Sequence, residues 1–322
     1  MIIDSHIHLS HGLYRGEFPF LAPEGDRYTV CSGSRGQLIR AMRDAGVAAC
    51  VEPAVEIDSN RELLALAAQY PGFLFPAVGV HPTRTFACRV YEKNGAVTER
   101  RLSWKRRGEL AEWAKSPGVV AIGETGLDYH LPRKEQHRIR QKLWFLYQMK
   151  LAKRRSLPLI LHIREADKSA VRMLKRAAPF PRGGVCHCFN GTAEQAKIYT
   201  SLGFMLGVGG SLLADTPRRR DLEQAVVRTP LESLLLETDG PFVKPDCPGL
   251  TKKQLRKARN TSLILPAVAK RVAELKGLTE EEVLRATSEN AIRLFGLAIR
   301  PENEKRQVKK PKTRNGGERL LP

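Results

Sequence analysis

Six side chains in this sequence have the chemistry of metal ligands and stand in or beside short apolar segments. His6 and His8 are separated by one residue, and the side chains of a strand alternate between its two faces. Two imidazoles at this spacing point the same way and can bind one ion. The other four each belong to a different apolar segment, namely Glu124, His162, His187 and Asp239.

The elements that must position these side chains form a regular series of short, continuous apolar runs. Continuous runs are typical of parallel strands that are buried on both faces. The expected strands are Ile2–Leu9, Ala48–Val55, Phe73–Val80, Val119–Ile122, Leu157–Ile163, Gly184–Phe189, Phe204–Val208 and Leu234–Thr238. Helical segments are expected between them at Gln37–Ala45, Arg61–Gln69, Glu109–Lys115, Lys134–Arg155, Ala166–Ala177 and Ala193–Leu202. This alternation over roughly 240 residues predicts an α/β fold, the (β/α)8 TIM barrel.

The barrel brings the candidate ligands together, because the carboxyl ends of its strands meet at one mouth. Glu124 follows the fourth expected strand, and His162 and His187 end the fifth and sixth. Buried imidazoles and carboxylates are costly unless they are paired or bound to metal. The set of His6, His8, Glu124, His162, His187 and Asp239 therefore predicts a metal centre at the barrel mouth.

Three further helical features are expected. In the segment Lys134–Arg155, apolar residues recur at helical spacing and predict the buried face; they are Ile139, Leu143, Leu146, Tyr147 and Leu151. Two closing helices are expected at Leu255–Lys276 and Glu280–Phe295. Thr279 followed by Glu282 predicts a capping box at the start of the second.

Two segments depart from the barrel pattern. Residues 1–300 are expected to form one domain, and the polar, basic segment Pro301–Pro322 is expected to be a mobile tail because it has too few apolar residues to fold. Thr83–Gly108 is longer than a typical strand-to-helix connection and is rich in charge, which favours a substrate loop.

The charge balance points to a polyanionic partner. Lys and Arg number 54 against 34 Asp and Glu, which gives a net charge of +20. Such an excess attracts nucleic acid, whose phosphates release counterions when they are neutralised. A general effect of charge on solubility is the alternative explanation.

The sequence has no apolar run of about 18 residues, so no membrane span is expected. Its first residues carry no leader pattern, so the expected compartment is the cytoplasm.

The six cysteines include no C-x-x-C pair and are expected to be reduced thiols. Cys186 and Cys188 flank His187 and could suggest a thiolate zinc site, but either strand alternation turns them away from an inward-facing His187 or all three fall on a bend. We expect them to be small buried hydrophobic residues.

The chain resembles the TatD family of metal-dependent hydrolases over roughly residues 1–297. The matching motifs keep their order along the chain: Asp4-Ser5-His6-Ile7-His8-Leu9, Gly79-Val80-His81-Pro82, Gly123-Glu124-Thr125-Gly126-Leu127-Asp128-Tyr129, Leu161-His162-Ile163-Arg164-Glu165-Ala166, His187-Cys188-Phe189-Asn190-Gly191 and Glu237-Thr238-Asp239-Gly240-Pro241-Phe242. Thr287 and Asn290, followed by Arg293-Leu294-Phe295, are similar to the closing helix of that family.

The resemblance implies a two-metal phosphodiesterase, typically an exonucleolytic deoxyribonuclease, with Mg or Zn as the ions and Mn as a further candidate. Carried over by position, one ion would be held by His6, His8 and Asp239, and the second by His162 and His187. Glu124 would bridge the two ions. Two adjacent cations can clamp the attacking and leaving oxygens of an in-line displacement.

The resemblance also suggests roles beyond metal binding. Asp239 is the best candidate to accept a proton from the attacking water, with Glu124 as the other catalytic carboxylate. His81 and Arg164 are expected at the same rim as substrate contacts, through charge-assisted hydrogen bonds to phosphate.

Two departures from the family pattern bear on the expected substrate. Gly240 stands where a serine is usual, and Arg259-Asn260-Thr261-Ser262 stands in place of an Arg-Asn-Glu-Pro run. Two other functions stay open at this stage: another amidohydrolase-like enzyme that cleaves an amide, a lactone or a phosphomonoester, and a non-enzymatic nucleic-acid-binding subunit of a larger complex. Glu124 stands where a carboxylated lysine of the fourth strand would be expected in the first, and the complete ligand set speaks against the second.

Overall fold

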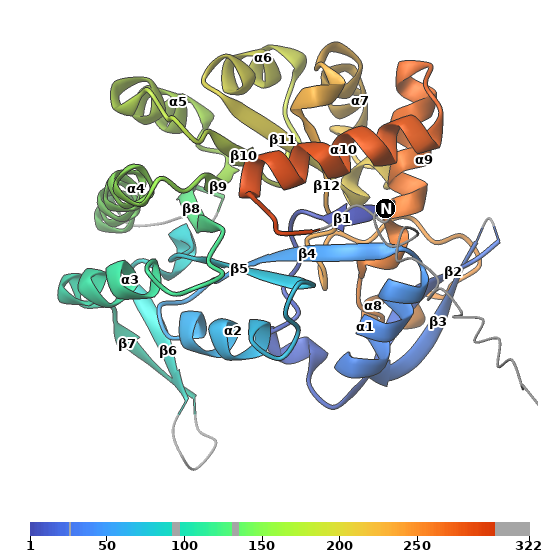
Figure 1. Ribbon diagram of the computed structural model, residues 1–322, viewed down its shortest axis with the longest axis horizontal. Coiled ribbons are helices and arrows are strands. Elements are labelled where there is room, and N and C mark those ends of the chain that lie inside the picture. The colour runs from blue at the N-terminus through green and yellow to red at the C-terminus, as the bar shows by residue number, and fades with distance from the viewer. Residues whose placement is uncertain (26, 92–96, 131–134, 300–322) are drawn as a thin grey trace, which may run out of the picture.

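Eight parallel strands form a closed barrel at the centre of the molecule (Figure 1). The computed structural model describes residues 1–25, 27–91, 97–130 and 135–299. In sheet order the strands are β1 (Ile2–Asp4), β4 (Val47–Pro53), β5 (Leu74–Val78), β8 (Ala121–Asp128), β9 (Leu159–Arg164), β10 (Gly184–Cys186), β11 (Phe204–Val208) and β12 (Leu234–Leu236).

Backbone hydrogen bonds join the first strand to the last and close the barrel. The Ser5 amide donates to the Leu236 carbonyl at 3.0 Å, and the Asp239 amide donates to the His6 carbonyl at 2.8 Å. All eight expected strands are present, so the predicted (β/α)8 architecture is confirmed.

Helices surround the barrel on its outside (Figure 1). They are α1 (Arg35–Asp44), α2 (Ser59–Ala67), α3 (Arg107–Trp113), α4 (Glu135–Arg155), α5 (Asp167–Ala177), α6 (Ala193–Ser201), α7 (Arg219–Arg228), α8 (Lys252–Lys257), α9 (Leu265–Lys276) and α10 (Glu280–Phe295). The capping box of Thr279 and Glu282 is confirmed at the start of α10.

The barrel interior is a packed core that α10 closes at the amino ends of the strands. The inward-facing residues are small or branched, and they come from seven of the strands: Ile3, Ala49, Val51, Ala77, Ala121, Ile160, Val185 and Leu235. Leu294 and Phe295 of α10 pack against this cluster, and Figure 1 shows the helix lying across the barrel beside β12 and β1. The carboxyl ends of the strands are thereby the open end, where barrel enzymes place their sites.

Several strand and helix boundaries differ from those predicted. β1 ends at Asp4 and β10 at Cys186, so His6, His8 and His187 follow their strands instead of standing within them. The fourth strand does not end at Ile122, because β8 continues through Glu124 to Asp128 and pairs with β9. The expected helix Leu255–Lys276 is two helices, α8 and α9, separated by an extended segment. The Asn260 side chain in that segment donates to the carbonyls of Thr238 and Val243, which fixes the chain away from helical geometry.

The expected buried face of α4 is also wrong in part. Ile139, Leu143 and Leu146 are exposed by 39–49%, although Leu151 is buried. The helix turns Trp144 and Phe145 into the core instead. Two buried glutamines fix this rotation, since Gln141 bonds to the backbone of Asp128 and Gln148 to that of Val80.

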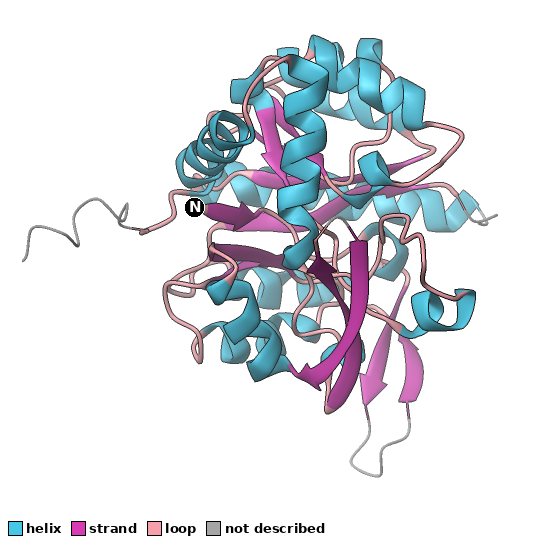
Figure 2. Ribbon diagram, turned by 90° about the vertical axis from the view of Figure 1, so that its right-hand side faces the viewer, coloured by secondary structure: helices cyan, strands magenta, loops and turns pink. Residues whose placement is uncertain are grey.

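Two antiparallel hairpins were not expected, and both lie in the lower half of Figure 2. The first pairs β2 (Glu17–Glu24) with β3 (Arg27–Ser34) and buries Phe18, Phe20 and Leu21. The second, β6 (Ala87–Tyr91) with β7 (Val97–Arg101), lies inside the segment Thr83–Gly108 that was expected to be a loop.

Three other expectations concern features outside the barrel. None of the helices in the described ranges is both long enough and apolar enough to cross a membrane. Every cysteine whose side chain is described is a free thiol, as expected. The expected basic tail, Pro301–Pro322, lies outside the described residues.

Candidate metal centre

One group of possible ligand atoms lies where β1 and β12 meet. The imidazole nitrogens His6 Nε2 and His8 Nε2 are 3.2 Å apart. Asp239 Oδ1 lies 3.3 Å from His8 Nε2 and 3.7 Å from His6 Nε2. Asp239 has a φ of 51°, a left-handed conformation that aspartate adopts more readily than most residues, as the chain turns away from β12.

A second group lies at the ends of β9 and β10. His162 Nδ1 is 3.0 Å from His187 Nε2. His81, which follows β5, brings its Nε2 to 3.5 Å from Glu124 Oε2. The structure therefore places His81 beside these possible ligands as well as at the rim where a substrate contact was expected.

Glu124 stands between the two groups, and each of its carboxylate oxygens faces one of them. Oε1 lies 3.1 Å from His8 Nε2 and 3.4 Å from His6 Nε2. Oε2 lies 3.3 Å from His187 Nε2 and 3.5 Å from His162 Nδ1. Its side chain is 3% exposed, so the carboxylate is committed to these partners.

The donor set and its spacing fit divalent ions. Ligands at about 2.1 Å from a tetrahedral ion are roughly 3.4 Å from one another. The nitrogen and oxygen atoms of both groups have separations of this size. Two imidazole nitrogens that face each other with no ion between them contribute little to the stability of the fold. Imidazole with carboxylate suits zinc, while carboxylate oxygens also suit magnesium and manganese.

The outer nitrogens of His8 and His162 are oriented by further groups, as is usual for histidines that bind metal, whereas those of His6 and His187 make no hydrogen bond among the described residues. His8 Nδ1 lies 3.3 Å from the carbonyl of Pro53, and His162 Nε2 lies 3.2 Å from Asp128 Oδ2. His187 Nδ1 lies 3.7 Å from Glu237 Oε1. Sequence reasoning assigned no role to Asp128 or Glu237, although both stand in the motifs that carry the resemblance.

Asp4 connects the first and last strands of the barrel beneath the first group. Its buried carboxylate accepts hydrogen bonds from the His6 amide, the Thr238 hydroxyl and the Ser262 hydroxyl. These bonds hold β1, β12 and the segment before α9 in one arrangement. Asp4 thereby positions the chain on either side of His6 and Asp239, a role that its place two residues before His6 could have indicated.

The electrostatics of the site keep its carboxylates anionic. Burial alone would raise the pKa of Glu124, but His81, His187 and His6 around it hold that pKa well below its usual range. Burial likewise opposes ionisation of Asp239, and the hydrogen bond with His8 lowers its pKa nonetheless. The centre therefore presents negative charge to a cation.

Three of the imidazoles respond in the opposite direction, whereas burial lowers the pKa of His6 and lowers that of His81 to about 3. Burial lowers the pKa of His187, but the facing Glu124 and Glu237 overcome this and raise it to about 10. The pKa of His8 and that of His162 are also raised, against burial, by Asp239 and Glu124 in one case and by Asp128 and Glu124 in the other. The neighbouring carboxylates thus favour the protonated form of these three imidazoles.

Both departures from the family pattern lie behind the first group. A Cβ at Gly240 would lie 2.7 Å from the Tyr14 hydroxyl and 2.8 Å from the Asn260 carbonyl, so a side chain there would displace them. The Tyr14 hydroxyl donates to that same carbonyl. Ser262, at the end of the altered run, donates to Asp4 at 2.7 Å. Both departures thus concern residues that pack behind the first group, and neither removes a candidate ligand.

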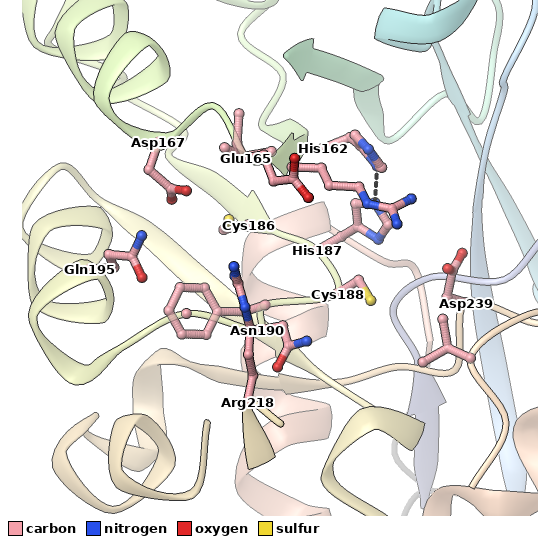
Figure 3. Close-up of a pocket in the computed structure, with 15 residues that line it drawn as sticks. His162, Glu165, Asp167, Cys186, His187, Cys188, Asn190, Gln195, Arg218 and Asp239 are labelled. Atoms are coloured by element: carbon pink, nitrogen blue, oxygen red, sulfur yellow. Dashed lines mark hydrogen bonds between the residues drawn. The ribbon is translucent and has the colours of Figure 1, made fainter. Parts of the chain in front are cut away.

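A cavity of about 440 Å³ opens beside the second group (Figure 3). Its lining includes His162, His187 and Asp239, together with Arg164 and the unexpected Arg218. Cys186 and Cys188 also line it; Cys186 is buried, as expected, whereas Cys188 is half-buried. Burial raises the pKa of both thiols, which keeps them protonated and unsuited to bind metal as thiolates.

The structure thus brings together all six candidate ligands and His81, and it places Arg164 on the wall of the adjoining cavity. The signal for most of them was their place beside a strand. Arg218, which precedes α7, carried no such signal because it lies outside every strand.

Comparison with known proteins assigns the family. The sequence model of a family described as TatD related DNase matches residues 3–296. A Bacillus subtilis protein named uncharacterized metal-dependent hydrolase YabD is 32% identical over 302 residues, which are 92% of this chain and 100% of the relative. A Rahnella protein named 3'-5' ssDNA/RNA exonuclease TatD is 32% identical over 267 residues, 83% of this chain and 94% of the relative.

A solved structure agrees with these relatives. The crystal structure of YJJV, a TatD homologue from Escherichia coli, superposes with a TM-score of 0.73 at 29% sequence identity, covering 92% of this chain and 98% of that one. The fold, the matched residues and the relatives lead to one conclusion: the chain belongs to the TatD related DNase family of metal-dependent hydrolases.

Proposed function

We propose that the protein hydrolyses phosphodiester bonds in DNA with two divalent ions, and that it acts as an exonuclease. The observation that carries this proposal is Glu124, whose two oxygens face two separate groups of imidazoles at 3.1–3.5 Å. One ion would be held by His6, His8 and Asp239, the second by His162 and His187. Magnesium and zinc fit these donors, and manganese is a further candidate.

The residues of the chain divide the chemistry among them. Two ions bound here would supply the charge that acidifies the attacking water and stabilises both oxygens of the displacement. Asp239 is anionic and accepts the proton of that water. Glu124 fixes the spacing of the two groups. His81 and Arg164 bind the phosphate oxygens, which orients the scissile bond.

The net charge of +20 supports a polyanionic substrate, and relatives are named as exonucleases of ssDNA and RNA. The competing function is hydrolysis of an amide, lactone or phosphomonoester at the same centre. The deciding experiment assays one preparation on single-stranded DNA, duplex DNA, RNA, a lactone, an amide and a phosphomonoester, each with and without chelator. Chelator-sensitive release of nucleotides supports the proposal, and turnover only of the other substrates contradicts it.

Replacing Arg164 tests the phosphate contact. Arg164→Ala is expected to raise the KM for oligonucleotides about tenfold with a smaller change in kcat, because a contact made equally in ground and transition states affects binding alone. Steady-state kinetics measure both constants. Arg172→Ala, an exposed arginine on α5 outside the cavity lining, is the matched control. Unchanged constants in the Arg164 variant would remove it from the substrate site.

Ion binding is expected to release protons at neutral pH. A metal binds the neutral imidazole, and the pKa of His8, His162 and His187 lies above the ordinary value of 6.5 in the ion-free protein. Their protons must leave when an ion enters, so affinity falls as the pH is lowered. Calorimetry in two buffers of different ionisation enthalpy measures the number released. An affinity for the ion that is constant between about pH 6 and pH 9 would contradict the assignment.

A further inference from the structure

Two arginines on the wall of the cavity have no acidic partner. Arg164 and Arg218 make no side-chain hydrogen bond or ion pair within the part of the chain that the structure describes. Other arginines of the molecule are paired: Arg106 with Asp58 and Glu109 at 2.6–2.7 Å, and Arg271 with Glu223 at 2.7 Å. The cavity therefore keeps two guanidinium groups available to a ligand.

The acidic residues of the same cavity are already engaged elsewhere. Glu165 faces His130, with 2.7 Å between Oε1 and Nδ1. Asp167 accepts a hydrogen bond from the Tyr199 hydroxyl at 2.9 Å. Neither carboxylate pairs with Arg164 or Arg218, and Asp239, the third acidic residue of the lining, faces His8 instead. Among the described residues, no ion pair therefore engages either guanidinium group.

The rest of the wall combines polar residues with the apolar Ile163, Phe189 and Val243. Asn190 Oδ1 is buried and has no hydrogen-bond partner among the described residues. A Cβ at the next residue, Gly191, would lie 2.6 Å from Gln195 Oε1 and 2.9 Å from the Phe189 ring, so this wall is held in place by its neighbours. Asn190 and Arg218 both line the cavity, together with His162 (Figure 3).

We propose that Arg218 binds the phosphate next to the scissile phosphate, so that the cavity holds one nucleotide of a longer strand. This inference rests on the proposed function of the metal centre. The scissile phosphate would lie against the bound ions and Arg164, the adjoining phosphate would meet Arg218, and Asn190 Oδ1 would accept a hydrogen bond from an N–H of the base between them. A volume of about 440 Å³ is in the range of small-ligand sites.

The choice of phosphate follows from the chemistry of the two groups. A guanidinium group binds phosphate by two parallel hydrogen bonds, and such charge-assisted bonds are roughly twice as strong as neutral ones. A second phosphate site lets the protein distinguish an oligonucleotide from a small diester, because the diester has only one phosphate to bind. The second phosphate contact thereby favours one class of substrate, namely single strands with at least two phosphates.

The test compares two substrates that differ by one phosphate. The wild-type protein is expected to hydrolyse the trinucleotide TpTpT with a higher kcat/KM than the dinucleotide TpT. Arg218→Ala is expected to lower this ratio about tenfold, since it removes one charge-assisted phosphate contact. Arg220→Ala, an exposed arginine two residues along that does not line the cavity, is the matched control and should keep the ratio. A misfolded variant would lose activity on TpTpT and on TpT equally, so its ratio of kcat/KM values would stay unchanged.

A binding measurement without ions separates this inference from the proposed function. Labelled TpTpT is titrated into wild type, Arg218→Ala and Arg218→Lys in the presence of chelator. Affinity is expected to fall about tenfold in the alanine variant and less in the lysine variant, which keeps the charge but loses the two-point contact. Equal affinity and an equal substrate ratio in wild type and Arg218→Ala would overturn the inference. Failure of wild type to cleave either substrate would instead overturn the proposed function, while the binding comparison would still decide the role of Arg218.

Discussion

Removing divalent ions is expected to lower phosphodiester hydrolysis at least about a thousandfold, because the Lewis-acid contribution of bound ions amounts to several kcal/mol. All candidate general acids and bases at the centre face positions that an ion would occupy, so the residues alone offer no substitute. Activity before dialysis against chelator, after it, and after restoring magnesium, zinc or manganese measures the effect. Persistence of full activity in metal-free protein would contradict the proposed mechanism.

The same experiment counts the ions. Elemental analysis of the restored protein is expected to give two ions per chain, and Glu124→Gln is expected to lose one of them because the amide cannot serve both groups. Glu194→Gln on α6 is the matched control, since this exposed carboxylate lies 3.7 Å from Arg228 and does not line the cavity. One ion per chain in the wild-type protein would contradict the bridging role of Glu124.

The barrel strands could be predicted because their environment leaves a strong pattern. Residues such as Val51 and Leu235 are buried, and both faces of these strands are covered by core or helix, so their apolar runs are continuous. The end of β8 could not be predicted from this pattern. Gly123 and Glu124 interrupt the apolar run, yet they remain in the strand because Glu124 is needed inside the barrel mouth.

The errors elsewhere arise where tertiary contacts decide between local alternatives. α4 has two apolar stripes, one through Leu143 and one through Trp144, and periodicity alone does not choose between them. The hydrogen bonds of Gln141 to the Asp128 backbone make the choice, and they join parts of the chain 13 residues apart. The break before α9 has a similar cause, because Asn260 bonds to residues that precede it by 17 and 22 positions.

The residues of the candidate site also differ in how far the sequence predicts them. The ligands in or beside strands could be predicted, since every strand of a parallel barrel ends at the same mouth. Asp128 is a strand residue too, but its role depends on the direction of one ring, His162, whose Nε2 it faces at 3.2 Å. Arg218 belongs to a connection, and the geometry of a connection is set by what it packs against more than by its own residue types.

Replacing Asp239 with asparagine is expected to lower kcat about 100-fold or more, the scale of a lost general base. The substitution keeps the size of the side chain but removes the anionic oxygen that lies 3.3 Å from His8 Nε2. Because it also weakens a ligand, activity is compared at saturating ion with the metal content of both proteins measured. Asp221→Asn, an exposed residue of α7, is the matched control.

The outcome for Asp239→Asn separates two roles that its position combines. If kcat stays about 100-fold low when two ions are bound, Asp239 acts as the proton acceptor as well as a ligand. If kcat recovers once the ions are restored, its role is ligation alone, and the proton acceptor must be sought elsewhere. Glu124 is then the next candidate, because it is the other carboxylate of the centre and both of its oxygens face the two groups.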